Sequence, residues 1–271
     1  MPSNLTRRHR HRLVLAVVLA AAVLLPASRA LAIVLGVPDG VGHPYVGAML
    51  AAWRTPGVQE EWCTGTLIAP KIVLTASHCG VEELGLRPDQ VWMSFDPAYV
   101  VGVSRLYHGT FVINPEYVAY QGQGGRADPL DIAIIRLDEA PPIAPATLPP
   151  AGLLASVDLR DAVMTAVGYG NTRIDKTKGL QNIVYDPVRR VATQSFLNLQ
   201  KQWLFMSANP STGDGGTCYG DSGGPHFIGD SDQIVSLTIT GDTACRDLEA
   251  TLRLDTDSTR RFLAAQGVPL P

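Results

Sequence analysis

The sequence predicts an all-β protein made of two halves of similar size and completed by one C-terminal helix. After residue 33, short apolar runs rich in β-branched residues alternate with turn residues, as is typical of antiparallel strands. A proline-rich connector at residues 140–152 divides the chain, and helical periodicity first appears near the C-terminus. Two closed or nearly closed β units packed together fit this pattern.

Residues 1–32 are expected to be a secretory signal peptide that is removed from the folded protein. Four arginines between residues 7 and 12 precede an apolar run at residues 13–25, and Ala30-Leu31-Ala32 is typical of a signal peptidase site. A membrane anchor is the alternative, but a run of 13 residues is short for a bilayer. We therefore expect a secreted protein with no stable membrane association after signal removal.

Composition excludes disorder and nucleic-acid binding. Of the 271 residues, 46% are hydrophobic and 17% charged, so the chain can bury a sizeable core. Residues 1–32 hold five arginines and no acidic residue, which leaves 17 basic and 25 acidic residues and a net charge of −8 in the rest. An acidic protein without basic patches is not expected to bind nucleic acid. We expect a monomer.

The individual elements follow from local patterns. The last residues predict a helix that is capped by residues 255–258, runs through Phe262 and Leu263 to about Gln266, and ends at Gly267. The strands expected before it are the apolar runs at residues 66–68, 72–75, 132–137, 162–167 and 234–240.

Four cysteines remain in the exported chain, and an even number predicts disulfides with three possible connectivities. Pairing neighbours gives Cys63–Cys79 and Cys218–Cys245. A zinc site is the alternative, although the spacing lacks the usual pair of cysteines two residues apart.

The segment Gly220-Asp221-Ser222-Gly223-Gly224-Pro225 points to nucleophilic catalysis. Glycines around Ser222 allow a sharp turn and close approach of a substrate carbonyl, and backbone N–H groups at such a turn can stabilise an oxyanion. A serine needs a general base, which in turn needs a carboxylate to orient it. His78 follows an apolar strand and is the candidate base. Asp131 begins another such strand and is the candidate carboxylate, with Asp128 as the alternative.

Three segments in this order, Thr75-Ala76-Ser77-His78-Cys79, Asp131-Ile132-Ala133-Ile134 and the Ser222 segment, resemble the signatures of the chymotrypsin/trypsin-like serine proteases. The resemblance covers nearly all of residues 33–266. It implies one protease domain over residues 33–271, built from two perpendicular six-stranded antiparallel β-barrels with a C-terminal helix. The implied boundaries are about 33–145 and 146–255 for the barrels and about 256–266 for the helix.

The resemblance also implies a role for each site residue. Ser222 would be the nucleophile, His78 the general base and Asp131 the orienting carboxylate, with the N–H groups of Gly220 and Ser222 as the oxyanion hole. Cleavage after Ala32 would leave a chain beginning Ile33-Val34-Leu35-Gly36, which resembles the start of active family members. In those enzymes the new amine pairs with the aspartate before the serine, here Asp221. We expect signal peptidase to create this active end.

The sequence does not define which substrate side chain the primary pocket prefers. The resemblance places substrate-binding residues at Gly216, Thr217, Tyr219, Ser236 and Thr238. Gly216 stands where an aspartate would select lysine or arginine, and glycine leaves that position neutral. Glu249 falls near the pocket wall, where it could restore a basic preference or block the pocket. An isolated glutamate usually faces solvent, and this is the orientation the sequence favours.

The sequence therefore predicts a secreted serine endopeptidase that acts on protein or peptide substrates and requires neither a metal nor an organic cofactor. Two alternatives stay open. One is a catalytically inactive, protease-like binding module, although such proteins usually lack one of the three catalytic residues. The other is an esterase with the same machinery, because ester and amide hydrolysis share their acyl chemistry.

Overall fold

The computed structural model describes residues 33–52, 58–80, 87–118, 127–173 and 183–271. The expected signal peptide at residues 1–32 lies outside the described residues. Within the described ranges, no helix is both long enough and apolar enough to cross a bilayer.

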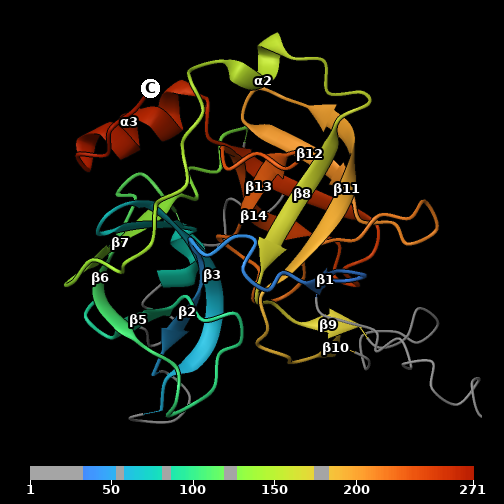
Figure 1. Cartoon of the computed structure of the whole chain (residues 1–271). Coiled ribbons are helices and arrows are strands. Elements are labelled where there is room, and N and C mark those ends of the chain that lie inside the picture. The colour runs from blue at the N-terminus through green and yellow to red at the C-terminus, as the bar shows by residue number, and fades with distance from the viewer. Residues whose placement is uncertain (1–32, 53–57, 81–86, 119–126, 174–182) are drawn as a thin grey trace, which may run out of the picture.

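The first half of the chain closes into a six-stranded barrel with the strand order β2-β3-β4-β7-β6-β5 (Figure 1). All neighbouring strands pair in the antiparallel sense, and side chains such as Met49, Leu67 and Ile134 are fully buried inside. A short 3-10 turn, η1 (Ser77–Gly80), follows β4 and carries His78. The strands are β2 (Val46–Ala51), β3 (Glu60–Ala69), β4 (Ile72–Thr75), β5 (Val91–Ser94), β6 (Tyr107–Ile113) and β7 (Ala133–Leu137).

The second half forms another six-stranded barrel, closed because β8 pairs with both β11 and β13. An additional strand, β1 (Val37–Pro38), pairs with β11, and β9 (Thr172–Arg173) pairs with β10 (Ile183–Val184). The expected fold class, two six-stranded antiparallel barrels with a C-terminal helix, is thus confirmed. The barrel strands are β8 (Val163–Gly168), β11 (Arg190–Leu199), β12 (Trp203–Ser207), β13 (Pro225–Ile228), β14 (Ile234–Gly241) and β15 (Leu248–Arg253).

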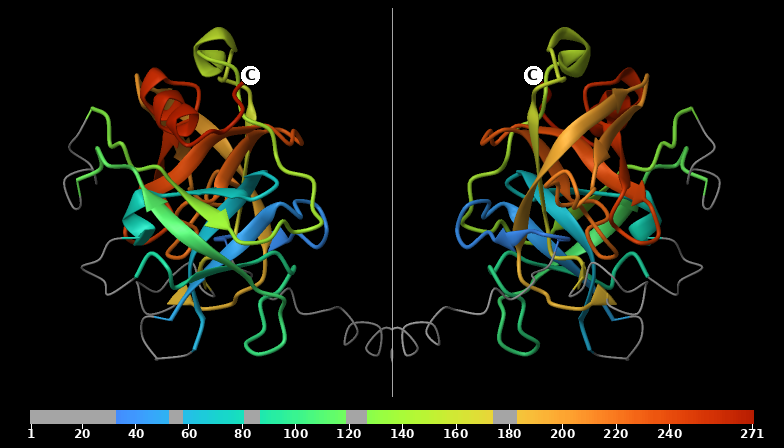
Figure 2. Two further views of the ribbon diagram at one scale, coloured as in Figure 1. Left: turned by 90° about the vertical axis from the view of Figure 1, so that its left-hand side faces the viewer. Right: turned by 90° about the vertical axis from the view of Figure 1, so that its right-hand side faces the viewer.

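Two short helices lie at the same end of the molecule in all three views (Figures 1 and 2). The first, α2 (Leu153–Ser156), follows the proline-rich connector between the barrels. The second, α3 (Asp257–Ala265), begins after Thr256 and ends at Gln266, close to the expected boundaries. Arg136 of β7 donates a hydrogen bond to the carbonyl of Gln266 at 2.8 Å, so the end of the chain is fastened to the first barrel.

A buried arginine ties the two barrels together. Arg189 immediately precedes β11 and is only 1% exposed. Its guanidinium donates to the Asp39 carboxylate at 2.8 Å, to the Phe95 carbonyl at 3.0 Å and to the Tyr169 hydroxyl at 3.2 Å. A guanidinium can serve several acceptors at once without losing its charge, which suits it to a buried junction. The arginine thus links the N-terminal segment, the first barrel and the second barrel.

Candidate active site

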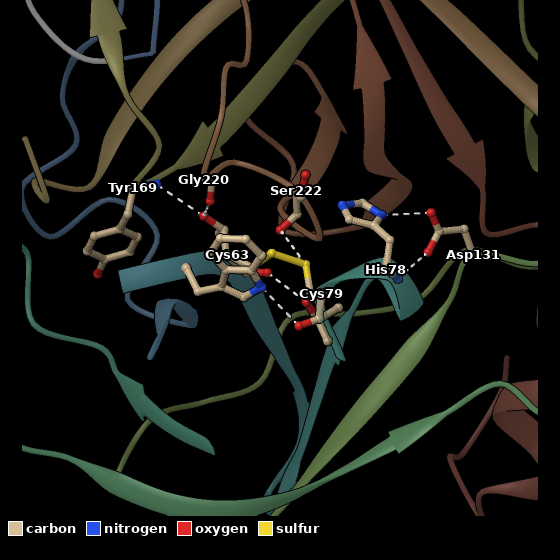
Figure 3. The surroundings of a disulfide bond; sticks show 10 residues. Cys63, His78, Cys79, Asp131, Tyr169, Gly220 and Ser222 are labelled. Atoms are coloured by element: carbon tan, nitrogen blue, oxygen red, sulfur yellow. Dashed lines mark hydrogen bonds and ion pairs between the residues drawn. A yellow bond between two sulfur atoms is a disulfide. The ribbon is translucent and has the colours of Figure 1, made fainter. Parts of the chain in front are cut away.

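A cavity of about 380 Å³ lies where the two barrels meet. His78 enters it from η1 of the first barrel, and Ser222 enters it from the loop before β13 of the second. Figure 3 shows Ser222, His78 and Asp131 in a row. The fold therefore brings the expected nucleophile and base together, although they lie in different halves of the sequence.

The imidazole of His78 is oriented by a buried carboxylate. Asp131, which is 1% exposed, accepts from the backbone N–H of His78 at 2.9 Å and contacts its Nδ1 at 2.7 Å. With Nδ1–H donated to Asp131, Nε2 keeps its lone pair and can accept a proton. Asp128, the alternative, caps a turn instead, because its carboxylate accepts from the backbone N–H of Leu130 at 3.1 Å.

The same carboxylate sets the pKa of His78. Burial alone lowers the pKa of the imidazole, but the negative charge and hydrogen bond of Asp131 outweigh burial, so the pKa is raised above the ordinary value of 6.5. The group is therefore prepared to take up a proton during a reaction. It must be neutral beforehand to act as a base.

Two polar residues fix the segment that carries Asp131. The hydroxyl of Ser77 donates to the Ile132 carbonyl at 2.7 Å and accepts from the backbone N–H of Asn114 at 3.2 Å. The Asn114 side chain donates to the Leu130 carbonyl at 3.0 Å. Sequence reasoning did not find Asn114, because nothing in its surroundings resembles a catalytic motif.

The loop that carries Ser222 needs its glycines. Gly220 and Gly223 have φ angles of 97° and 80°, in the left-handed region that other residues rarely adopt. A Cβ on Gly223 would also come within 2.2 Å of the Thr75 hydroxyl. Within the described residues, the backbone N–H groups of Gly220 and Ser222 donate to no other protein group. They are therefore available to a substrate oxygen.

Thr64 on β3 joins this loop to the first barrel and is fully buried. Its backbone N–H donates to the Ser222 carbonyl at 2.9 Å, and its hydroxyl donates to the Gly220 carbonyl at 2.9 Å. The same hydroxyl accepts from the backbone N–H of Tyr169 at 3.2 Å. Thr64 was not identified from sequence, although it directly follows Cys63.

The cysteines form the neighbouring pairs, Cys63–Cys79 and Cys218–Cys245. The first pair joins β3 to η1 directly after His78, and the second joins the Ser222 loop to the connection between β14 and β15. Cys63 and Cys79 lie close to His78, but their sulfurs are bonded to each other and are not thiolates. This arrangement excludes the zinc alternative at these residues.

The expected substrate-binding residues divide into two groups. Thr217, Tyr219 and Thr238 line the cavity beside Ser222, whereas Gly216 and Ser236 are not among its lining residues. A Cβ on Gly216 would meet the Cβ of Ala208 at 2.3 Å, so this position faces packed protein. The hydroxyl of Ser236 is buried and lies 2.9 Å from the Thr251 hydroxyl.

The expectation that Glu249 faces solvent is wrong. This residue is only 1% exposed and lies behind the cavity wall, where Gln194 donates a hydrogen bond to its carboxylate at 2.6 Å. His226 is fully buried beside it.

Asp221 is fully buried next to the nucleophile loop and accepts backbone hydrogen bonds from Gly170 at 2.8 Å and Cys218 at 2.9 Å. Burial raises the pKa of this carboxyl to about 7 in spite of these bonds. Ile33 is also fully buried, and Val34 exchanges backbone hydrogen bonds with Gly216. The segment that follows the expected cleavage site therefore lies against the second barrel.

Comparison with known proteins gives a consistent result. The family model described as Trypsin matches residues 42–251. A protein named Trypsin from Saccharopolyspora erythraea is 26% identical over an alignment 214 residues long, which covers 75% of this chain and 84% of that protein. The solved structure of a collagenase superposes with a TM-score of 0.63 over 87% of this chain and 98% of its own. Its sequence is 16% identical, so this likeness concerns the fold alone.

Thr64→Val keeps the shape of the side chain but removes the hydroxyl, leaving the Gly220 carbonyl and the Tyr169 N–H without their partner. We expect the free energy of unfolding to fall by about 1–3 kcal/mol. We also expect slower covalent reaction of Ser222 with a fluorophosphonate, because the Gly220 segment is less well held. Thr64→Ser, which keeps the hydroxyl, is the matched control and should react at nearly the original rate. Equal reaction rates for the valine and serine variants would contradict the role given to the hydroxyl.

Proposed function

Because the chain belongs to the trypsin family of serine endopeptidases, we propose that it is a secreted enzyme that cleaves peptide bonds through Ser222, His78, Asp131 and an acyl-enzyme intermediate. One observation carries this proposal. The His78 imidazole is held by Asp131 through Nδ1 in the same cavity as Ser222, beside two unused backbone N–H groups. This arrangement supports acyl transfer to a serine.

In the first half of the reaction, Nε2 of His78 removes the proton from Ser222 as Oγ attacks the substrate carbonyl carbon. The carbonyl oxygen becomes an oxyanion, which the N–H groups of Gly220 and Ser222 stabilise; loss of one such donor typically costs about 3–4 kcal/mol. Asp131 stabilises the imidazolium that forms. His78 then gives its proton to the leaving nitrogen, the C–N bond breaks, and an ester on Ser222 remains.

In the second half, water takes the place of the departed amine. His78 removes a proton from the water as its oxygen attacks the ester carbonyl, and the same two N–H groups hold the new oxyanion. Collapse of this intermediate breaks the bond to Ser222 Oγ, which recovers its proton from His78. The free carboxylic acid leaves, and the enzyme returns to its starting state.

Secretion is supported by the sequence of residues 1–32 and by the two disulfides, which form in oxidising compartments. The Asp221 carboxylate supports activation by the chain end at Ile33. A fully buried carboxylate is costly without a cation, and its contacts among the described residues are neutral N–H groups. The ammonium of a chain that begins at Ile33 would supply that cation.

The experiment that tests the function uses purified secreted protein, a fluorophosphonate probe and intact mass before and after reaction. We expect a single adduct on Ser222, its absence in Ser222→Ala, and hydrolysis of peptide amides that is lost in the same variant. A folded protein that begins at Ile33 and takes up no probe would contradict the proposal and favour a non-catalytic binding module. Labelling with hydrolysis of esters but not of peptide amides would instead indicate an esterase.

The pH dependence of kcat/KM should reflect His78. Because the neutral imidazole is the base and its pKa is raised, activity should be present above that pKa and lost as the pH falls through it, at a pH above 6.5. Asp131→Asn removes the charge that raises the pKa, so the acid limb should move to lower pH. The same change should lower kcat by on the order of 10⁴-fold, because it also favours the wrong tautomer. An unchanged acid limb in this variant would argue against His78 as the titrating base.

The chain end can be tested by comparing protein that begins at Ile33 with protein that keeps Ala32, both carrying Ser222→Ala to prevent self-cleavage. In the extended form the pKa of Asp221 is about 7 when folded against an ordinary 3.8, so its fold should lose stability as the pH rises from about 4 to about 7. The form that begins at Ile33 should lose much less stability over this pH range, because its ammonium stabilises the Asp221 carboxylate. Identical pH profiles, or a secreted protein that begins at Leu31, would contradict activation at Ile33.

A further inference from the structure

A buried polar cluster lies directly behind the cavity that holds His78 and Ser222. Its centre is Glu249 on β15, which does not itself line the cavity. Two residues that do line it reach back to the Glu249 carboxylate: the backbone N–H of Thr217 at 3.4 Å and the hydroxyl of Thr238 at 3.4 Å. The carboxylate is thus separated from the cavity by this one layer of residues.

The carboxylate has further partners deeper in the second barrel. Nε2 of His226 on β13 lies 3.1 Å from Oε1 of Glu249, and the amide nitrogen of Gln194 on β11 donates to Oε2 at 2.6 Å. Burial alone raises the pKa of this carboxyl, but the contacts with His226, Thr217 and Gln194 outweigh burial and lower it. Oε2 therefore accepts two hydrogen bonds, and Oε1 accepts one from Thr238 and lies within ion-pair distance of His226, so this buried carboxylate already has protein partners.

The cavity itself offers little to a cation. Among the described residues that line it, the one carboxylate is that of Asp242, which accepts backbone hydrogen bonds from four residues of its own loop, 244 and 246–248. The other lining residues include Thr217, Tyr219, Thr238 and Ile239, none of which has a charged side chain. These surfaces suit a side chain without charge.

We propose that Glu249 and His226 form an internal ion pair that closes the base of the specificity cavity, so that the enzyme prefers an uncharged residue before the scissile bond and discriminates against lysine and arginine. The proposal rests on the proposed function. A substrate ammonium or guanidinium would give up its hydration on entering the cavity without reaching a carboxylate that lacks partners. An uncharged side chain does not have to give up the hydration of a charged group when it enters.

The first test is the selectivity of the unaltered enzyme. Peptide amides that differ only in the residue before the scissile bond, namely leucine, phenylalanine, glutamine, lysine or arginine, are compared by kcat/KM per fluorophosphonate-titrated site. We expect lysine and arginine to be at least about 10-fold poorer than the best uncharged residue. A preference for lysine or arginine would overturn the proposal. An enzyme that takes up no probe would fail the proposed function instead, so the two failures are distinguishable.

Two substitutions test the pair itself. His226→Gln removes the cation, so the ratio of kcat/KM for lysine over leucine should rise by about 10-fold as the unpaired carboxylate attracts a substrate cation. The double substitution Glu249→Gln/His226→Gln removes both charges of the proposed pair, so the same ratio should change by less than about 3-fold. A tenfold loss of lysine cleavage in the double variant would overturn the proposal, as would an unchanged ratio in a folded His226→Gln.

His108→Gln is the matched control. His108 also contacts a carboxylate, Asp138, at 2.6 Å, but it lies on the surface and does not line the cavity. Its substitution should leave the ratio unchanged, and a rise equal to that of His226→Gln would overturn the assignment to Glu249. If His226→Gln does not fold, the selectivity of the unaltered enzyme and of the double variant decides whether the proposal holds.

Discussion

The active site depends on the hydrogen bonds that Thr64 makes across the interface between the barrels. The histidine belongs to the first barrel and the serine to the second, so neither barrel alone can set the distance between them. Thr64 binds the carbonyls of both Gly220 and Ser222 from the edge of the first barrel. Because Thr64 is buried, water does not compete for these bonds, and they hold the Ser222 loop against β3 of the first barrel. Arg189 supplies a second, independent link between the barrels.

Two buried carboxylates lie beneath this loop. Burial is the main cause of the raised pKa of Asp221, and the charge of Glu249 raises it further. Each one needs its own cation, because like charges in a dry interior disfavour one another. His226 is the available partner for Glu249, and the chain end at Ile33 is the proposed partner for Asp221.

The candidate catalytic residues could be proposed from the sequence, whereas most of the residues that position them could not. Ser222, His78 and Asp131 stand in recognisable local segments, and the helix ends lie close to their capping signals, because both depend on near neighbours. The partners of Thr64 and Arg189 are distant: Gly220 is 156 residues from Thr64, and Asp39 is 150 from Arg189. The periodicity of one strand identifies its buried face but not what lies opposite. Glu249 was misjudged for this reason, since its burial depends on residues from other strands.

Because disulfides border the cavity, its shape depends on whether the surroundings of the protein are oxidising or reducing. Cys63, Cys218 and Cys245 all line the cavity, and Cys79 directly follows His78. A chain kept in a reducing compartment would have neither link, so the histidine segment and the rim opposite it would be held by weaker forces alone. Such a chain is expected to be a poor catalyst until it meets an oxidising environment. The covalent bonds that shape the site would thus also spare the proteins of the cell that makes the enzyme.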